Sequence, residues 1–182
     1  MEKRRIWDMI AQLPLICGFL AVAGLASYFL SLMVCWLLNI QFPELSITYL
    51  LFASSAPGFV LAVVLMWLFM HKVGSNDAAF VLESGGSSPG WLPAACVMVI
   101  SLGVYGFVQW LFSLFRWIFF SGPSHFFAFG IYLCTDPGDS YAALDALPIW
   151  SRALSYVLYA LVILPFMYLG YYRGFKRSVG SK

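Results

Sequence analysis

The sequence predicts an all-α integral membrane protein, a four-transmembrane-helix bundle with an interfacial or re-entrant segment between the third and fourth spans. Of its 182 residues, 62% are apolar and only 10% are charged, whereas a soluble domain has roughly 45–50% and about 25%. Aromatic residues reach 19%, which excludes a disordered chain, because such chains lack the apolar surface needed to fold. The placement of the charges then gives the number of spans.

Four stretches of the chain contain no charged residue and are long enough to cross the hydrocarbon core, which takes about 20 apolar residues in a helix. They predict one membrane domain over residues 1–182, with spans at about residues 10–38, 47–70, 91–115 and 154–172. The first span would be roughly 40 Å long as a single helix, so we expect it to tilt or to lie partly in the interface.

A fifth uncharged stretch, residues 117–135, competes for the same assignment. It contains Gly122, Pro123 and His125, and most of its apolar side chains are aromatic rings, which favour the headgroup region as well as the core. We interpret it as an interfacial or re-entrant segment within a larger outer region, residues 117–153.

The distribution of basic residues supports four crossings rather than five. With four, the termini and the 72–90 loop share one side, and that side holds eight of the ten basic residues, namely Lys3, Arg4, Arg5, Lys72, Arg173, Lys176, Arg177 and Lys182. Only Arg116 and Arg152 fall opposite. Because cytoplasmic loops are rich in Lys and Arg, both termini are predicted to be cytoplasmic in a plasma membrane, most simply a bacterial one.

Small residues recur along the first span at spacings of three and four, so they share one helix face. They are Cys17, Ala21, Gly24, Ser27 or Tyr28, Ser31 and Cys35. Small side chains allow a neighbouring backbone to approach closely. This face is therefore a candidate surface for a membrane protein partner or a second copy, although packing within the bundle is the more common use. Ser101, Gly103 and Gly106 of the third span are a candidate internal counterpart.

The second span contains a candidate helix break in Ser54, Ser55, Pro57 and Gly58. Proline removes a backbone donor and clashes with the preceding turn, so we expect a kink or local unwinding. Broken helices form ligand sites in transporters, but kinks also occur in purely structural spans.

Aromatic and basic residues follow the last span. Arg173, Lys176 and Arg177 are predicted to anchor the chain at the membrane surface, because cations near the span end are attracted to an anionic cytoplasmic leaflet. The lipid bilayer is the partner that this composition indicates most directly, and no nucleic-acid partner is expected.

Catalytic and metal-binding patterns are lacking in the sequence. No Asp, Glu, Lys, Arg or His lies in the middle of a predicted span, where it would mark a functional site, and His71 and His125 are predicted on opposite sides of the membrane. Asp136, Asp139 and Asp145 are better explained as turn and cap residues than as a cation site. A Cys35–Cys134 disulfide is conceivable, but four buried free thiols are favoured. No cofactor or metal is expected.

The function that these observations predict is non-enzymatic association, as an accessory or scaffold subunit of a larger membrane assembly. The first alternative is a component of a transporter or channel that uses residues 54–58. The second is a lipid-modifying membrane enzyme, which would require the three aspartates of the outer region to be catalytic.

Overall fold

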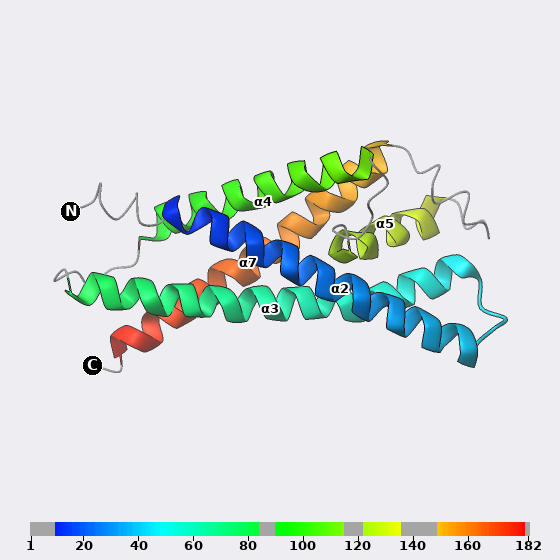
Figure 1. Cartoon of the computed structure of the whole chain (residues 1–182), viewed down its shortest axis with the longest axis horizontal. Helices are drawn as coiled ribbons and strands as arrows, with labels where there is room; N and C mark the ends of the chain where they lie inside the picture. The colour runs from blue at the N-terminus through cyan, green and yellow to red at the C-terminus, as the bar shows by residue number, and fades with distance from the viewer. Residues whose placement is uncertain (1–9, 84–89, 115–121, 136–148, 181–182) are drawn as a thin grey trace. The chain divides into compact units, whose positions relative to one another are not determined.

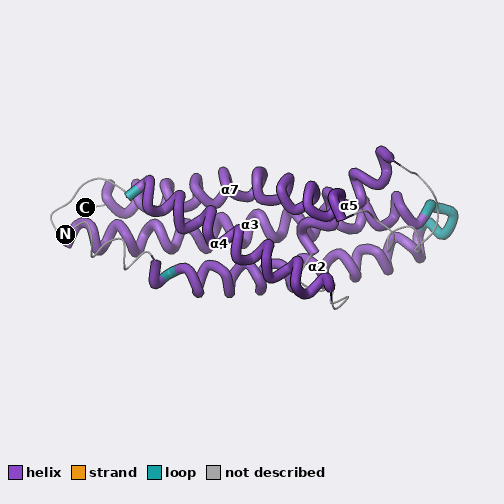
Figure 2. Tube along the Cα trace, turned by 90° about the horizontal axis from the view of Figure 1, so that it is seen from above, coloured by secondary structure: helices purple, strands orange, loops and turns teal. Residues whose placement is uncertain are grey.

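The structure, a computed structural model, describes residues 10–83, 90–114, 122–135 and 149–180. Within these ranges the chain forms helices α2 (Leu13–Gln41), α3 (Ile47–Glu83), α4 (Trp91–Leu114), α5 (Gly122–Thr135) and α7 (Ile149–Gly180) (Figure 1). No strand occurs in the described residues, and the few non-helical positions include the short connection between α2 and α3 (Figure 2). The all-α prediction is confirmed.

Four of these helices are long and apolar enough to cross a membrane. They correspond to Leu13–Gln41, Ile47–Glu83, Trp91–Leu111 and Ala153–Gly180. Helix α5 has 14 residues and is therefore only about 21 Å long, which is less than the roughly 30 Å of a hydrocarbon core. The number of predicted spans agrees with the structure, while the interfacial or re-entrant placement of residues 117–135 stays a prediction.

Helices α3 and α7 are longer than predicted. Helix α3 has 37 residues rather than ending near residue 70, and the predicted loop at 72–90 is helical as far as Glu83. Helix α7 has 32 residues and continues beyond residue 172 through the basic tail. The reason is packing: Ala78 and Val81 of α3 form a buried cluster with Phe175 of α7, so apolar contacts continue where the mean hydropathy falls.

The connection between α2 and α3 is short, as predicted. The backbone N–H of Phe42 donates to the carbonyl of Leu38 and ends α2, and Leu45 N–H donates to the carbonyl of Phe42 across the turn that holds Pro43. The carbonyl of Ser46 accepts the first helical bond of α3, from Leu50. A proline that cannot donate is typical of such a boundary, whereas the buried hydroxyl of Ser46 has no hydrogen-bond partner and does not cap α3.

The packing divides into two compact units. Unit 1 comprises Met1–Ala21, Val63–Val108 and Val162–Lys182, and unit 2 comprises Val22–Ala62 and Gln109–Leu161. Helices α2, α3, α4 and α7 each contribute to both units. The division therefore does not separate two stretches of sequence, and the single membrane domain over residues 1–182 stays a prediction.

The interior of unit 1 is filled by long, flexible side chains from all four of its helical segments. Leu20 of α2, Met66 and Met70 of α3, Met98 of α4 and Met167 of α7 are each at most 1% exposed. Methionine has an unbranched, polarizable side chain that fills irregular gaps. It suits a membrane bundle in which dispersion contacts must provide much of the helix association.

Glycines bring α3 and α7 into backbone contact in unit 1. A Cβ placed on Gly74 would meet the backbone of Tyr171, one on Gly170 the carbonyl oxygen of Trp67, and one on Gly174 the carbonyl oxygen of His71. Because backbone atoms cannot swing aside, only glycine fits at these positions. Ser75 and Ser178 extend the same contact with a hydroxyl–hydroxyl hydrogen bond of 2.8 Å.

Unit 2 is held by aromatic stacking between α5 and α3. The ring of Phe126 stacks on Phe52 and Phe59, with centroid separations of 4.9 and 5.2 Å. Phe127 meets Phe59 edge to face, and so does Tyr159 of α7. Offset stacked and edge-to-face rings contribute beyond their buried area, so the rings of α5 pack against helices of the same chain.

The glycine contact predicts a specific sensitivity to small substitutions. We expect Gly174→Ala to lower the free energy of unfolding by about 1–3 kcal/mol, because the added methyl group forces two backbones apart. The measurement is titration with a denaturing detergent. The control is Gly103→Ala, where a Cβ would meet nothing within 4 Å and helix propensity improves by up to about 1 kcal/mol. Equal losses in both variants would contradict this account of the crossing.

Candidate functional site

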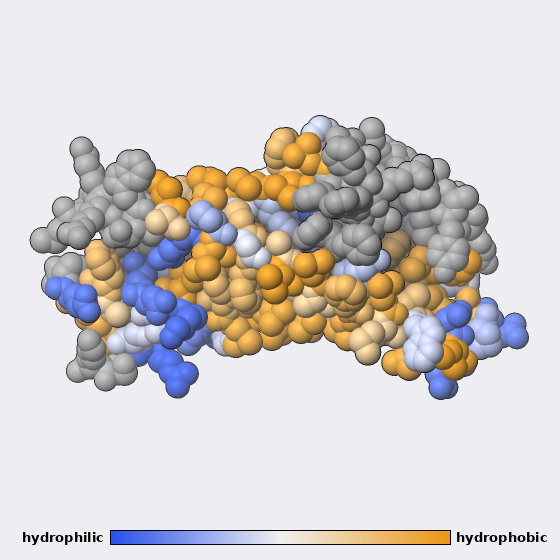
Figure 3. All heavy atoms as spheres, viewed as in Figure 1, coloured by the Kyte–Doolittle hydropathy of each residue, from blue (hydrophilic) through white to orange (hydrophobic). Residues whose placement is uncertain are grey.

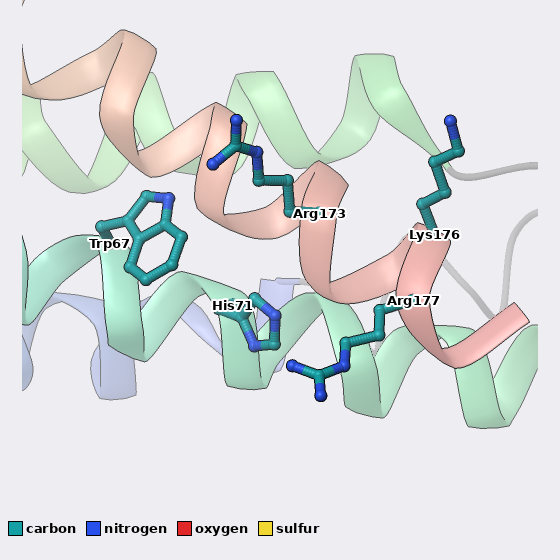
Figure 4. Close-up of a pocket in the computed structure, with 5 residues that line it drawn as sticks. All are labelled: Trp67, His71, Arg173, Lys176 and Arg177. Carbon is teal, nitrogen blue, oxygen red and sulfur yellow. The ribbon is translucent and has the colours of Figure 1, made fainter. Parts of the chain in front are cut away.

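Cationic side chains gather on one face of α7 near its C-terminal end. Arg173, Lys176 and Arg177 are spaced three and four residues apart, so they lie on neighbouring turns of one face, and all three are exposed. Together with Trp67 and His71 of α3 they line an open groove of about 400 Å³ (Figure 4). We call these five residues the basic groove.

The glycine contact between α3 and α7 positions both walls of the groove. Gly170 lies against the carbonyl of Trp67 and Gly174 against the carbonyl of His71, so each residue of the α3 wall sits opposite a glycine of α7. The rings of Trp67 and His71 are 5.8 Å apart between centroids. In Figure 4, Arg177 extends toward His71, whereas Lys176 lies at the outer edge of the groove. The spacing of the two walls is thus fixed by backbone contact.

The groove contains no carboxylate among its lining residues. The nearby acidic residue of α3, Asp77, is instead buried, and it accepts a hydrogen bond from the hydroxyl of Tyr171. Guanidinium, ammonium and indole groups are all hydrogen-bond donors. The groove can therefore donate hydrogen bonds to an anion while the carboxylate is held in the packed interior.

Sequence reasoning missed both the buried acid and the second wall of the groove. Asp77 falls in the predicted 72–90 loop, yet it lies four residues from Val73 and four from Val81, and all three are buried on α3. Helical periodicity continued past Lys72 would have found it. Gly170 and Gly174 form a Gly-x-x-x-Gly pattern, a known close-packing signal in membrane helices.

At several positions, the predicted partner face of α2 already contacts other helices of the same chain. In unit 1 the Cys17 thiol donates to the carbonyl of Ser101 at 3.7 Å. In unit 2 a Cβ on Gly58 of α3 would meet Ser27 and Ser31, and the Ser31 hydroxyl donates to the Ser27 carbonyl at 2.9 Å.

The remaining members of that face are at least partly enclosed. Gly24 is buried, whereas Ala21 and Cys35 are partly buried. The use of this face by a partner stays a prediction. Gly103, expected as an internal counterpart, does not act as one: it is exposed, and a Cβ placed on it would point into open space.

The predicted break in the second span has a helical backbone. Helix α3 continues through Pro57, so the structure has no unwound turn there. The hydroxyls of Ser54 and Ser55 donate to the carbonyls of Leu51 and Phe52 at 3.0 and 2.8 Å. Such bonds keep the serines satisfied inside an apolar span. The role of this segment in a substrate path stays a prediction.

The remaining predicted sites are the four cysteines, possible metal ligands and the three outer aspartates. Cys17, Cys35, Cys96 and Cys134 are all free thiols, so the conceivable Cys35–Cys134 disulfide is not formed. The expected burial of the four thiols is wrong, because Cys17 and Cys35 are only partly buried and Cys96 and Cys134 are exposed. No group of three or more potential metal ligands occurs among the residues that the structure describes. The outer aspartates Asp136, Asp139 and Asp145 lie outside the described residues.

The buried Tyr171–Asp77 pair predicts a measurable loss when its donor is removed. We expect Tyr171→Phe to lower the free energy of unfolding by about 1–3 kcal/mol, because a buried carboxylate loses a hydrogen bond without regaining water. The neighbouring Tyr172 is 41% exposed, so Tyr172→Phe should change stability by less than about 0.5 kcal/mol. Both are measured by denaturing-detergent titration, and equal effects would show that the pair is unimportant.

Comparison with known proteins provides no family for this chain. No protein-family model matches it, and no curated protein or solved structure is significantly similar to it. The function must therefore be inferred from the chemistry of its own residues.

Proposed function

We propose that this chain is a non-enzymatic multi-pass protein of the plasma membrane, most simply a bacterial one, that acts as an accessory or scaffold subunit of a larger membrane assembly. Its partners would be the lipid bilayer and either another membrane protein or a second copy. The support comes from the outward faces of the spans.

The spans leave most of their residues outside the packed interior. Between 28% and 39% of the residues in each apolar 18-residue window are buried inside the chain. In a bilayer there is no hydrophobic force between helices, so association depends on close packing and hydrogen bonds. The large outward surface is available for lipid and for neighbouring helices.

The main support for association with another subunit is Gly103, an exposed glycine on α4. Val99, Gly103 and Phe107 are spaced four residues apart, so they share one face, and Val99 and Phe107 are 54% and 58% exposed. A Cβ on Gly103 would meet nothing within 4 Å. The two large side chains thus flank a notch in which a helix of another subunit could approach the α4 backbone.

The proposed orientation rests on the basic side chains. Four exposed ones, Lys72, Arg173, Lys176 and Arg177, all belong to unit 1. Unit 1 also contains the N-terminal parts of α2 and α4 and the C-terminal parts of α3 and α7. This gathering supports a cytoplasmic location for both termini, because positive charge accumulates on that side.

Cysteine labelling tests the orientation. In a variant whose four native cysteines are replaced by alanine, we expect Lys176→Cys to react with a membrane-impermeant maleimide only after the cells are permeabilised. Glu44→Cys, in the exposed α2–α3 connection, should react in intact cells. The opposite pattern, or labelling of both positions in intact cells, would show that the proposed topology is wrong.

Filling the notch on α4 tests the association. We expect Gly103→Leu to reduce the amount of co-purifying partner or homo-oligomer by about tenfold in mild detergent, because the added side chain blocks close backbone approach. The matched control is Ile100→Leu, a change of nearly equal volume at a position that is 51% exposed. Thermal unfolding of each variant verifies that the fold is intact.

Two outcomes would contradict the proposal. One is that the unmodified protein purifies as a monomer without any partner under native conditions. The other is that Gly103→Leu and Ile100→Leu retain the same partner in equal amounts, which would place the association elsewhere on the chain.

A further inference from the structure

We propose that the basic groove binds the phosphate of one anionic phospholipid headgroup. This inference goes beyond the association function and does not depend on it, because a monomer could bind lipid equally well. It rests on the charge of the groove, its position beside an apolar surface, and the fixed spacing of its walls.

The donors of the groove match a phosphate diester. Arg173 and Arg177 present guanidinium forks, which bind phosphate oxygens in a bidentate manner, and Lys176 adds a compact charge at the edge. None of the described residues that line the groove is acidic, and Asp77 is bonded to Tyr171 in the interior. A bound phosphate would therefore meet only attractive charges at the groove wall.

The surface next to the groove is apolar, which favours a lipid over free phosphate. Leu169 and Tyr172 of α7 are 46% and 41% exposed, and Leu68 of α3 is 52% exposed. These residues adjoin the lining residues Trp67 and Arg173 in the sequence or lie within one turn of them. Figure 3 shows hydrophilic side chains gathered near the C-terminal ends of α3 and α7, beside a largely hydrophobic surface. Acyl chains can follow that surface while the phosphate occupies the groove.

The indole of Trp67 is suited to the boundary between lipid headgroups and acyl chains. Tryptophan is enriched at membrane–water interfaces, where its ring contacts apolar chains and its N–H meets polar groups. The groove volume of about 400 Å³ lies within the roughly 300–1,000 Å³ that is usual for small-ligand sites.

The walls of the groove are preorganised, which separates this site from a flexible polybasic tail. Gly170 and Gly174 hold α7 against the backbone of Trp67 and His71, and the Ser75–Ser178 bond lies one turn farther along. Because the backbone that carries the donors is already in place, ligand binding orders less of the chain than it would in a flexible tail. We therefore expect the groove to prefer an anionic phospholipid over a zwitterionic one more strongly than its positive charge alone would.

The test compares lipid binding by the full-length protein purified in a neutral detergent. Phosphatidylglycerol and phosphatidylcholine with the same acyl chains are titrated, and bound lipid is counted by native mass spectrometry. We expect one phosphatidylglycerol to bind with at least about tenfold preference over phosphatidylcholine. Equal binding of the two lipids would overturn the proposal.

A charge-matched pair of variants locates the site. The triple variant Arg173→Gln, Lys176→Gln, Arg177→Gln should weaken phosphatidylglycerol binding by roughly 100-fold at low ionic strength, since each cation near the surface contributes about fivefold. The control variant Lys3→Gln, Arg4→Gln, Arg5→Gln removes the same charge outside the described residues. Equal losses in both would show general attraction and no site in the groove.

Two further measurements distinguish a specific lipid-binding site from a merely charged surface and from a site for free phosphate. The double variant Arg173→Lys, Arg177→Lys keeps the charge but loses the guanidinium forks. We expect about tenfold weaker binding, and unchanged binding would show that the groove is only a charged surface.

Inorganic phosphate at 10-fold excess over lipid should displace little phosphatidylglycerol, whereas full displacement would assign the groove to free phosphate. Unchanged thermal unfolding of each variant verifies the fold.

Discussion

The contact between the backbones of α3 and α7 is the constraint on which unit 1 depends. Gly74, Gly170 and Gly174 leave room for a carbonyl where any other residue would place a methyl group. In lipid, helices gain little from hiding apolar surface, so the close approach of two backbones and the dispersion contacts it permits become decisive. Every polar feature described in unit 1 near the ends of these helices is arranged around that contact.

Near the contact between α3 and α7, the acidic side chain is buried and the basic side chains are exposed. Tyr171 follows Gly170 and points into the interior, where its hydroxyl is bonded to Asp77. Arg173 and Arg177 lie on the exposed side of the same helix. One short stretch of α7 thus buries an acid–phenol pair and displays cations. An anion approaching the surface meets the basic side chains, because the acidic one is buried and hydrogen-bonded in the interior.

The gross architecture could be predicted because gaps between charges are visible in a sequence. The spans predicted at residues 10–38 and 91–115 correspond closely to Leu13–Gln41 and Trp91–Leu114. The extensions of α3 and α7 were missed because hydropathy falls at Lys72, while the packing of Ala78 and Val81 on Phe175 is a tertiary contact. The cations of the groove were predicted as an anchor. Their partners Trp67 and His71 were not, since nothing local reveals which carbonyl a glycine will meet.

The length of α3 limits how it can be placed in any bilayer. Its 37 residues make a helix of about 55 Å, whereas a hydrocarbon core is roughly 30 Å thick. Tilting it until it fitted within the core would take roughly 57°, beyond the observed range of about 0–40°. As a straight helix at the steepest common tilt, about 40°, α3 would still extend roughly 12 Å beyond the hydrocarbon along the membrane normal. Because a bilayer is about 40–45 Å thick with its headgroups, the ends of such a helix would lie among the headgroups, and a molecule that approaches the membrane there would contact α3 before it reaches the acyl chains.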